Sequence, residues 1–229
     1  MTISIRQQRL AIVGALLLWC TALIWYRIYL ASGLHHTIGE KAGLGLLWNL
    51  FLATVPLLWS SAFQTATIRQ RPVWAGIFFC LWLLFLPNAP YILTDLIHLA
   101  PRPHVPLWFI LALLLSCAGT GAMLGYLSIL DVHAVVEEKF SKTTGWAVAI
   151  SSLLLCAFGI YLGRFLRWNS WDALANPLQL LRSIVRQFID PSVHPHPLGV
   201  TVVFGLGLIL GYLALRVVAL PNRSQCRTA

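Results

Sequence analysis

The chain has 229 residues, of which 59% are apolar and only 10% are charged. A soluble domain carries about 25% charged residues, so this composition excludes a soluble enzyme, a disulfide scaffold, a disordered tail and a coiled coil. The net charge of +9 would suit nucleic-acid binding in a soluble protein, but the basic residues fall in short gaps between apolar runs and no nucleic-acid motif is present. These residues are expected to set the membrane topology and to contact anionic lipid headgroups.

Six apolar runs are long enough to cross a bilayer, which takes about 20 residues. We predict an all-α, polytopic membrane protein that forms a single integral membrane domain over residues 1–229. The expected spans are residues 10–31, 42–63, 73–86, 105–130, 145–163 and 199–220. Arg6 and Arg9 precede the first run, as in a signal peptide, but its length favours an uncleaved span. Arg27, near the far end of this span, is expected to reach the headgroups.

Prolines interrupt the third span. The run from Pro72 to Leu86 makes a helix of about 22 Å in a hydrocarbon core of about 30 Å. The sequence therefore predicts a helix broken at Pro87–Pro90 and a half-helix over residues 91–99. Broken backbone at this depth is tolerated only against protein or a wet cavity, and it often marks a binding site in transporters. The alternative is a kinked helix that ends normally at the surface.

Three polar residues share one face of this half-helix. Tyr91, Asp95 and His98 are spaced i, i+4 and i+7 among apolar neighbours. Asp95 and His98 are weak candidates for a catalytic acid and base, or for two metal ligands. Asp95 could equally orient His98 or pair with an arginine. One carboxylate and one histidine are a weak metal signal, so we predict no metal site and no cofactor.

Arginines and tryptophans gather at the end of the fifth span. Arg164, Arg167 and Trp171 are spaced i, i+3 and i+7, and two guanidinium groups on one face would clamp a phosphate or carboxylate. Trp168 and Trp171 suit the membrane interface. Alternatively, these side chains simply anchor a helix end among headgroups. We expect Asp95 to pair with Arg164 or Arg167, because an unpaired charge at the edge of the hydrocarbon is costly.

Residues 177–189 predict an amphipathic helix that does not span the membrane. Asn176 suits its N-cap and Pro177 its first position. The apolar residues at helical spacing are Leu178, Leu181, Val185 and Phe188. The residues expected on the opposite face are Gln179, Arg182, Ser183 and Arg186. Such a helix either lies in the headgroup plane or packs on the bundle.

Close packing of the later spans is indicated by GxxxG spacings. They occur at Gly121/Gly125, Gly159/Gly163 and Gly207/Gly211, and predict contact among spans four, five and six.

The charged residues 131–142 are expected to form an ordinary loop after the fourth span. The five cysteines include no CxxC pair, and we predict no disulfide.

Orientation follows from the Lys and Arg count on each side of the six spans. The N-terminal side holds eight and the other side seven, of which four lie in residues 164–198. If those four serve another purpose, the remaining bias of eight to three places both termini in the cytoplasm.

Two long motifs resemble a known family. LPNAPYILTDLIHL at residues 86–99 and GRFLRWNSWD at residues 163–172, followed by NPL at Asn176, are similar to bacterial membrane proteins grouped as domain of unknown function 1361. The resemblance runs roughly from the second span to the last. It implies a polytopic protein of the bacterial inner membrane and carries no assigned activity.

Three function classes remain open at this stage: a structural or assembly component, a protein that binds or transports an anionic lipid or small anion, and a membrane enzyme acting on a lipid-linked or phosphorylated substrate. Membrane lipids are the expected partners, and an anionic lipid or another phosphate-bearing ligand is a further candidate. Protein partners are unknown. The candidate ligand-binding residues are Asn88, Tyr91, Arg164, Arg167, Trp168, Trp171 and Asp172.

Overall fold

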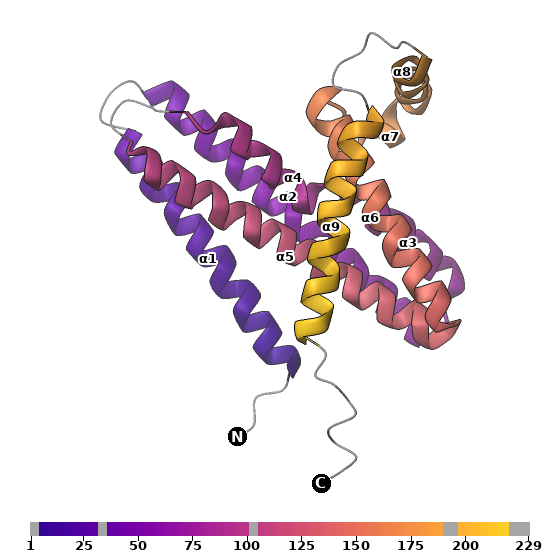
Figure 1. Ribbon diagram of the computed structural model, residues 1–229. Helices are drawn as coiled ribbons and strands as arrows, with labels where there is room; N and C mark the ends of the chain where they lie inside the picture. Colours follow the sequence, from indigo (N-terminus) through magenta and orange to yellow (C-terminus); the bar gives the residue numbers. More distant parts are fainter. Residues whose placement is uncertain (1–4, 32–35, 101–104, 190–196, 220–229) are drawn as a thin grey trace. The chain divides into compact units, whose positions relative to one another are not determined.

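The computed structural model describes residues 5–31, 36–100, 105–189 and 197–219, which contain helices and no β-strand (Figure 1). Within these ranges, six helical segments are long and apolar enough to cross a membrane. The predicted all-α polytopic fold is therefore confirmed. The chain divides into two compact units, residues 1–135 and 136–229.

The first unit is built from long apolar helices around one core. These are α1 (Ile5–Ala31), α2 (His36–Ile68), α3 (Pro72–Phe85) and all but the last turn of α5 (Leu107–Lys139). A short helix, α4 (Asn88–Tyr91), and a 3-10 helix, η1 (Ile92–His98), follow α3. The core draws on α1, α2, η1 and α5, with Cys20, Ile24, Leu50, Ala53, Ile92 and Leu113 among its buried side chains.

The second unit pairs α6 (Lys142–Phe165) with α9 (Pro197–Ala219). A Cβ added to Gly205 would lie 2.9 Å from Leu154 Cδ2, so the absence of a side chain lets the two helices approach. A Cβ on Gly207, which belongs to the predicted GxxxG pair, would meet nothing within 4 Å. The short α7 (Asp172–Ala175) and α8 (Pro177–Ile189) follow the end of α6.

The charged residues 131–139 belong to α5, so the prediction of a loop there is wrong. Arg9 Nη1 lies 2.6 Å from Asp131 Oδ1, and Arg9 Nη2 donates to Oδ2 at 3.0 Å. In the second unit, Arg216 Nη2 donates to Glu137 Oε2 at 3.0 Å. Charges that would end a span are tolerated here because partners from the first and last helices pair with them.

Candidate functional site

The predicted break in the third span is present. Helix α3 ends at Phe85, and the chain turns through Leu86 and Pro87 before α4 begins. The side-chain amide of Asn88 donates to Phe85 O at 2.9 Å, which satisfies one of the carbonyls left free at the helix end. Asn88 thus has a structural role, and its part in ligand binding stays a prediction.

The broken segment is buried against protein. Ala89 and Ile92 are fully buried in the first unit. Gly121 and Gly125 of α5 face this segment: a Cβ on Gly121 would overlap the carbonyl oxygen of Ala89, and one on Gly125 would lie 3.2 Å from Ala89 Cβ. This GxxxG pair therefore admits the broken backbone of the third span. Burial in protein is the condition under which irregular backbone persists at membrane depth.

The segment after the break is a 3-10 helix and not the α-helical half-helix assumed for the spacing of its polar residues. With three residues per turn, positions 95 and 98 fall one turn apart, whereas Tyr91 ends the preceding α4. The side chain of His98 lies outside the described residues. The expected common face of Tyr91, Asp95 and His98 is therefore not formed as an α-helix would form it.

Asp95 lies half-buried inside the first unit. Its Oδ2 accepts a hydrogen bond from Asn49 Nδ2 of α2 at 3.3 Å. Arg27 of α1 is only 6% exposed, so it does not reach out to the headgroups as expected. The first unit thus holds both a half-buried carboxylate and a buried guanidinium.

The end of α6 takes a shape that the predicted helical spacing does not describe. The helix stops at Phe165, and Arg167 adopts a left-handed conformation with φ of 58°. The backbone N–H of Trp168 then donates to Leu162 O at 3.2 Å, which closes the helix end. Arg164 remains in the last turn of α6, while Arg167 and Trp171 leave the helix. The i, i+3, i+7 face proposed for these residues is therefore lost.

The loop that follows is held by Asp172. Its Oδ2 accepts the Asn169 N–H at 2.7 Å, and the Asp172 N–H donates to Asn169 O at 3.0 Å. Trp171 keeps 41% of its surface exposed, and Trp168 is half-buried. Asp172 is thus occupied with local backbone, whereas both indoles keep part of their surface accessible.

Helix α8 has the predicted bounds and exposes its apolar stripe. The exposed fractions are 68% for Leu178, 57% for Leu181, 46% for Val185 and 74% for Ile189. On the other side of the helix, Gln187 Oε1 accepts a hydrogen bond from the Tyr161 hydroxyl of α6 at 2.9 Å. The face of α8 that carries Gln187 therefore lies toward α6, and the stripe faces outward.

Arg182 and Arg186 border this stripe. They were expected on the opposite face, but with Leu181, Val185 and Ile189 they line an open pocket of about 430 Å³. The side chain of Phe188 lies outside the described residues. Guanidinium groups at the edge of an exposed apolar stripe can keep their charge in the headgroups while their stems cover hydrocarbon.

A family model described as "Protein of unknown function (DUF1361)" matches residues 48–210. The chain belongs to this family. No curated protein and no solved structure matches it. The match to the DUF1361 model includes both motifs, Asn49 and α8, and it leaves α1 with Arg27 outside. The resemblance found in the two motifs is thus confirmed. The description of the family assigns no function to its members.

The predicted site residues of this DUF1361 protein divide between the two units. Asn88, Tyr91, Asp95 and His98 belong to the first unit, and the residues from 164 to 172 belong to the second. The pairing of Asp95 with Arg164 or Arg167 stays a prediction. Inspection of the sequence missed Asn49, although a lone amide within an apolar run is a signal that could have identified it. Within the described ranges, no three His, Cys, Asp or Glu side chains gather as metal ligands would.

Proposed function

We propose that this protein binds anionic lipid headgroups, or another phosphate-bearing ligand, through residues 164–189. The binding would take place at the outer face of its membrane, where the headgroups meet water. The observation that carries the proposal is the exposed apolar stripe of α8 with Arg182 and Arg186 along its edge. A stripe of this kind is costly in water but suits the boundary between headgroups and acyl chains. The two guanidinium groups then lie at the depth of the phosphates.

The end of α6 supports the same role. The Tyr161 hydroxyl of α6 donates a hydrogen bond to Gln187, which links α8 to the rest of the second unit. Arg164 and Arg167 add two further guanidinium groups beside the half-buried Trp168 and the exposed Trp171. Arginine forks bind phosphate oxygens bidentately, and indoles favour the headgroup region. Together these residues would recognise a phosphate and the interface that presents it.

A structural or assembly role is the second candidate. It is favoured by Asn88 and Asp172, whose side chains bond to neighbouring backbone. An enzyme that uses Asp95 and His98 and a transporter of lipid or small anions remain alternatives, and turnover or flux of a defined substrate would support them.

We expect lipid preference to depend on α8. Native mass spectrometry of the full chain should show tighter binding of dioleoylphosphatidylglycerol than of dioleoylphosphatidylcholine. At the α8 site, this preference should fall roughly 30-fold in Arg182→Gln/Arg186→Gln, because each basic residue near an anionic surface contributes about 1 kcal/mol. Lys142→Gln, which removes an exposed charge at the start of α6, is the matched control and should leave the preference unchanged. An unchanged preference in the α8 variant would favour the structural role.

We further propose that the protein lies in a bacterial inner membrane with both termini in the cytoplasm. The six spans and the bias of basic residues support this orientation. In a background without native cysteines, His35→Cys should label with a membrane-impermeant maleimide from the outside of intact cells. Arg223→Cys should label only after the membrane is opened. Labelling of both positions from the same side would contradict the proposed topology.

A further inference from the structure

A second basic groove lies in the first unit, where α2 turns into α3. Gln70 has a left-handed conformation with φ of 53°. Its N–H donates to Thr67 O at 3.0 Å, and the Arg71 N–H donates to Ala66 O at 2.9 Å. This pair of bonds is the Schellman pattern that closes a helix. Pro72 then begins α3, so Arg69 and Arg71 flank a tight, fixed turn.

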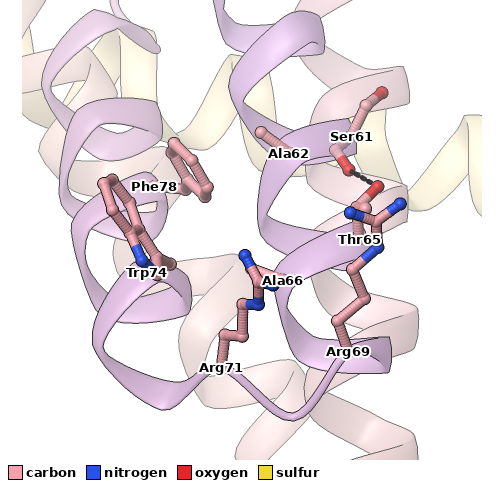
Figure 2. Close-up of a pocket in the computed structure, with 8 residues that line it drawn as sticks. All are labelled: Ser61, Ala62, Thr65, Ala66, Arg69, Arg71, Trp74 and Phe78. Atoms are coloured by element: carbon pink, nitrogen blue, oxygen red, sulfur yellow. Dashed lines mark hydrogen bonds between the residues drawn. The ribbon is translucent and has the colours of Figure 1, made fainter.

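The groove has a basic mouth and an apolar body (Figure 2). Its volume is about 410 Å³, and its lining residues are Ser61, Ala62, Thr65, Ala66, Arg69, Arg71, Trp74 and Phe78. The Arg71 guanidinium rises between the helices beside Ala66, and that of Arg69 points toward Thr65. The small side chains of α2 leave the space that the aromatic rings of α3 border.

The polar groups available to a ligand are the two guanidinium groups and the indole N–H of Trp74. The Thr65 hydroxyl donates to Ser61 O at 2.9 Å, and the Ser61 hydroxyl donates to Leu57 O at the same distance, so both serve the helix backbone. Among the described residues, Arg69 and Arg71 form no ion pair, in contrast to Arg9 and Arg216. Two unneutralised cations at one mouth favour an anion that can accept several N–H bonds.

The surroundings of the groove indicate an amphiphile. Ile68, Val73 and Trp74 are exposed around the turn, which suits contact with lipid and not with water. The rings of Trp74 and Phe78 lie 5.9 Å apart and form a continuous apolar wall. We propose that this groove binds one anionic phospholipid, with its phosphate between Arg69 and Arg71 and its hydrocarbon along Trp74 and Phe78. The proposal does not depend on the α8 site, which lies in the other unit.

The test is native mass spectrometry of the full chain with dioleoylphosphatidylglycerol and with dioleoylglycerol, which has the same chains and no phosphate. Tight binding should require the phosphate. Arg69→Gln/Arg71→Gln should lose one tightly bound phospholipid, with an affinity loss of roughly 30-fold at that site. Arg182→Gln/Arg186→Gln should retain it. Failure of the groove and failure of the α8 site are therefore separate results.

A second variant tests the groove by filling it, so that a loss of binding can be distinguished from a loss of folding. Ala62→Leu fills the groove but keeps both arginines, and it should lose the same phospholipid while the melting temperature is maintained. Binding that survives both Arg69→Gln/Arg71→Gln and Ala62→Leu would overturn the proposal. Displacement of the phospholipid by inorganic phosphate would also overturn it, because the site would then be one for a soluble anion.

Discussion

Gly121→Ala should lower the free energy of unfolding by about 3 kcal/mol or more. The new Cβ would overlap the carbonyl oxygen of Ala89, and a backbone atom cannot rotate away as a flexible side chain can. Overpacking of a well-packed core costs about 1–3 kcal/mol, and here the broken segment of the third span would have to move as well. The melting temperature in detergent, followed by circular dichroism, measures the effect.

Gly119→Ala is the matched control in the same helix. A Cβ at Gly119 would meet nothing within 4 Å, so the change should be neutral or slightly stabilising because alanine favours a helix. Equal melting temperatures for Gly121→Ala and the wild type would contradict the close contact between α5 and α4. The contrast between the two variants separates packing from helix propensity.

Asp95→Asn should destabilise the protein by about 3 kcal/mol. Asparagine can keep the contact with Asn49, but it removes the negative charge. We expect this loss to leave a buried cation without its counter-charge, which is costly. Arg27 of α1, which is 6% exposed, is the cation that we expect to pair with Asp95. Arg27→Gln should therefore cost a similar amount.

A double-mutant cycle identifies the partner of Asp95. We expect a coupling free energy above about 1 kcal/mol between Asp95→Asn and Arg27→Gln, because each single change removes the same interaction. If Arg27 is the partner, Arg164→Gln and Arg167→Gln should add to Asp95→Asn without coupling. Coupling to either of these arginines, and none to Arg27, would contradict this assignment and support the pairing predicted from the motifs. Intact stability of Asp95→Asn with loss of a measurable activity would point to a chemical role.

The spans and the break could be predicted because both are local signals. Long apolar runs give the helices, and Pro87 and Pro90 remove backbone donors at a depth where no water replaces them. The 3-10 helix that follows could not be predicted in the same way. It follows α4, where Ala89 lies against Gly121 and Gly125, about thirty residues away in sequence, and a contact at that separation gives no local signal.

Charges inside the membrane were the least predictable feature. Asp131 and Glu137 were assigned to a loop because their partners, Arg9 and Arg216, come from the opposite ends of the chain. The prediction that Arg164 and Arg167 share one face requires the helix to continue past Arg167. The helix ends before this residue, and Arg167 has a left-handed backbone conformation. By contrast, α8 was predicted with its bounds, because Asn176, Pro177 and the apolar spacing all act within a few residues.

We propose that the arginines of α8 contact lipid phosphates, and this contact can be measured directly. Solid-state NMR can measure the dipolar coupling between guanidinium carbons labelled with ¹³C and headgroup ³¹P in bilayers of dioleoylphosphatidylglycerol. We expect arginine carbons whose coupling indicates hydrogen bonding, with nitrogen–oxygen distances of about 2.7–2.9 Å. Part of this signal should disappear in Arg182→Gln/Arg186→Gln and persist in Lys142→Gln. A ³¹P coupling that is identical in the wild type and in Arg182→Gln/Arg186→Gln would show that these arginines do not contact lipid phosphate.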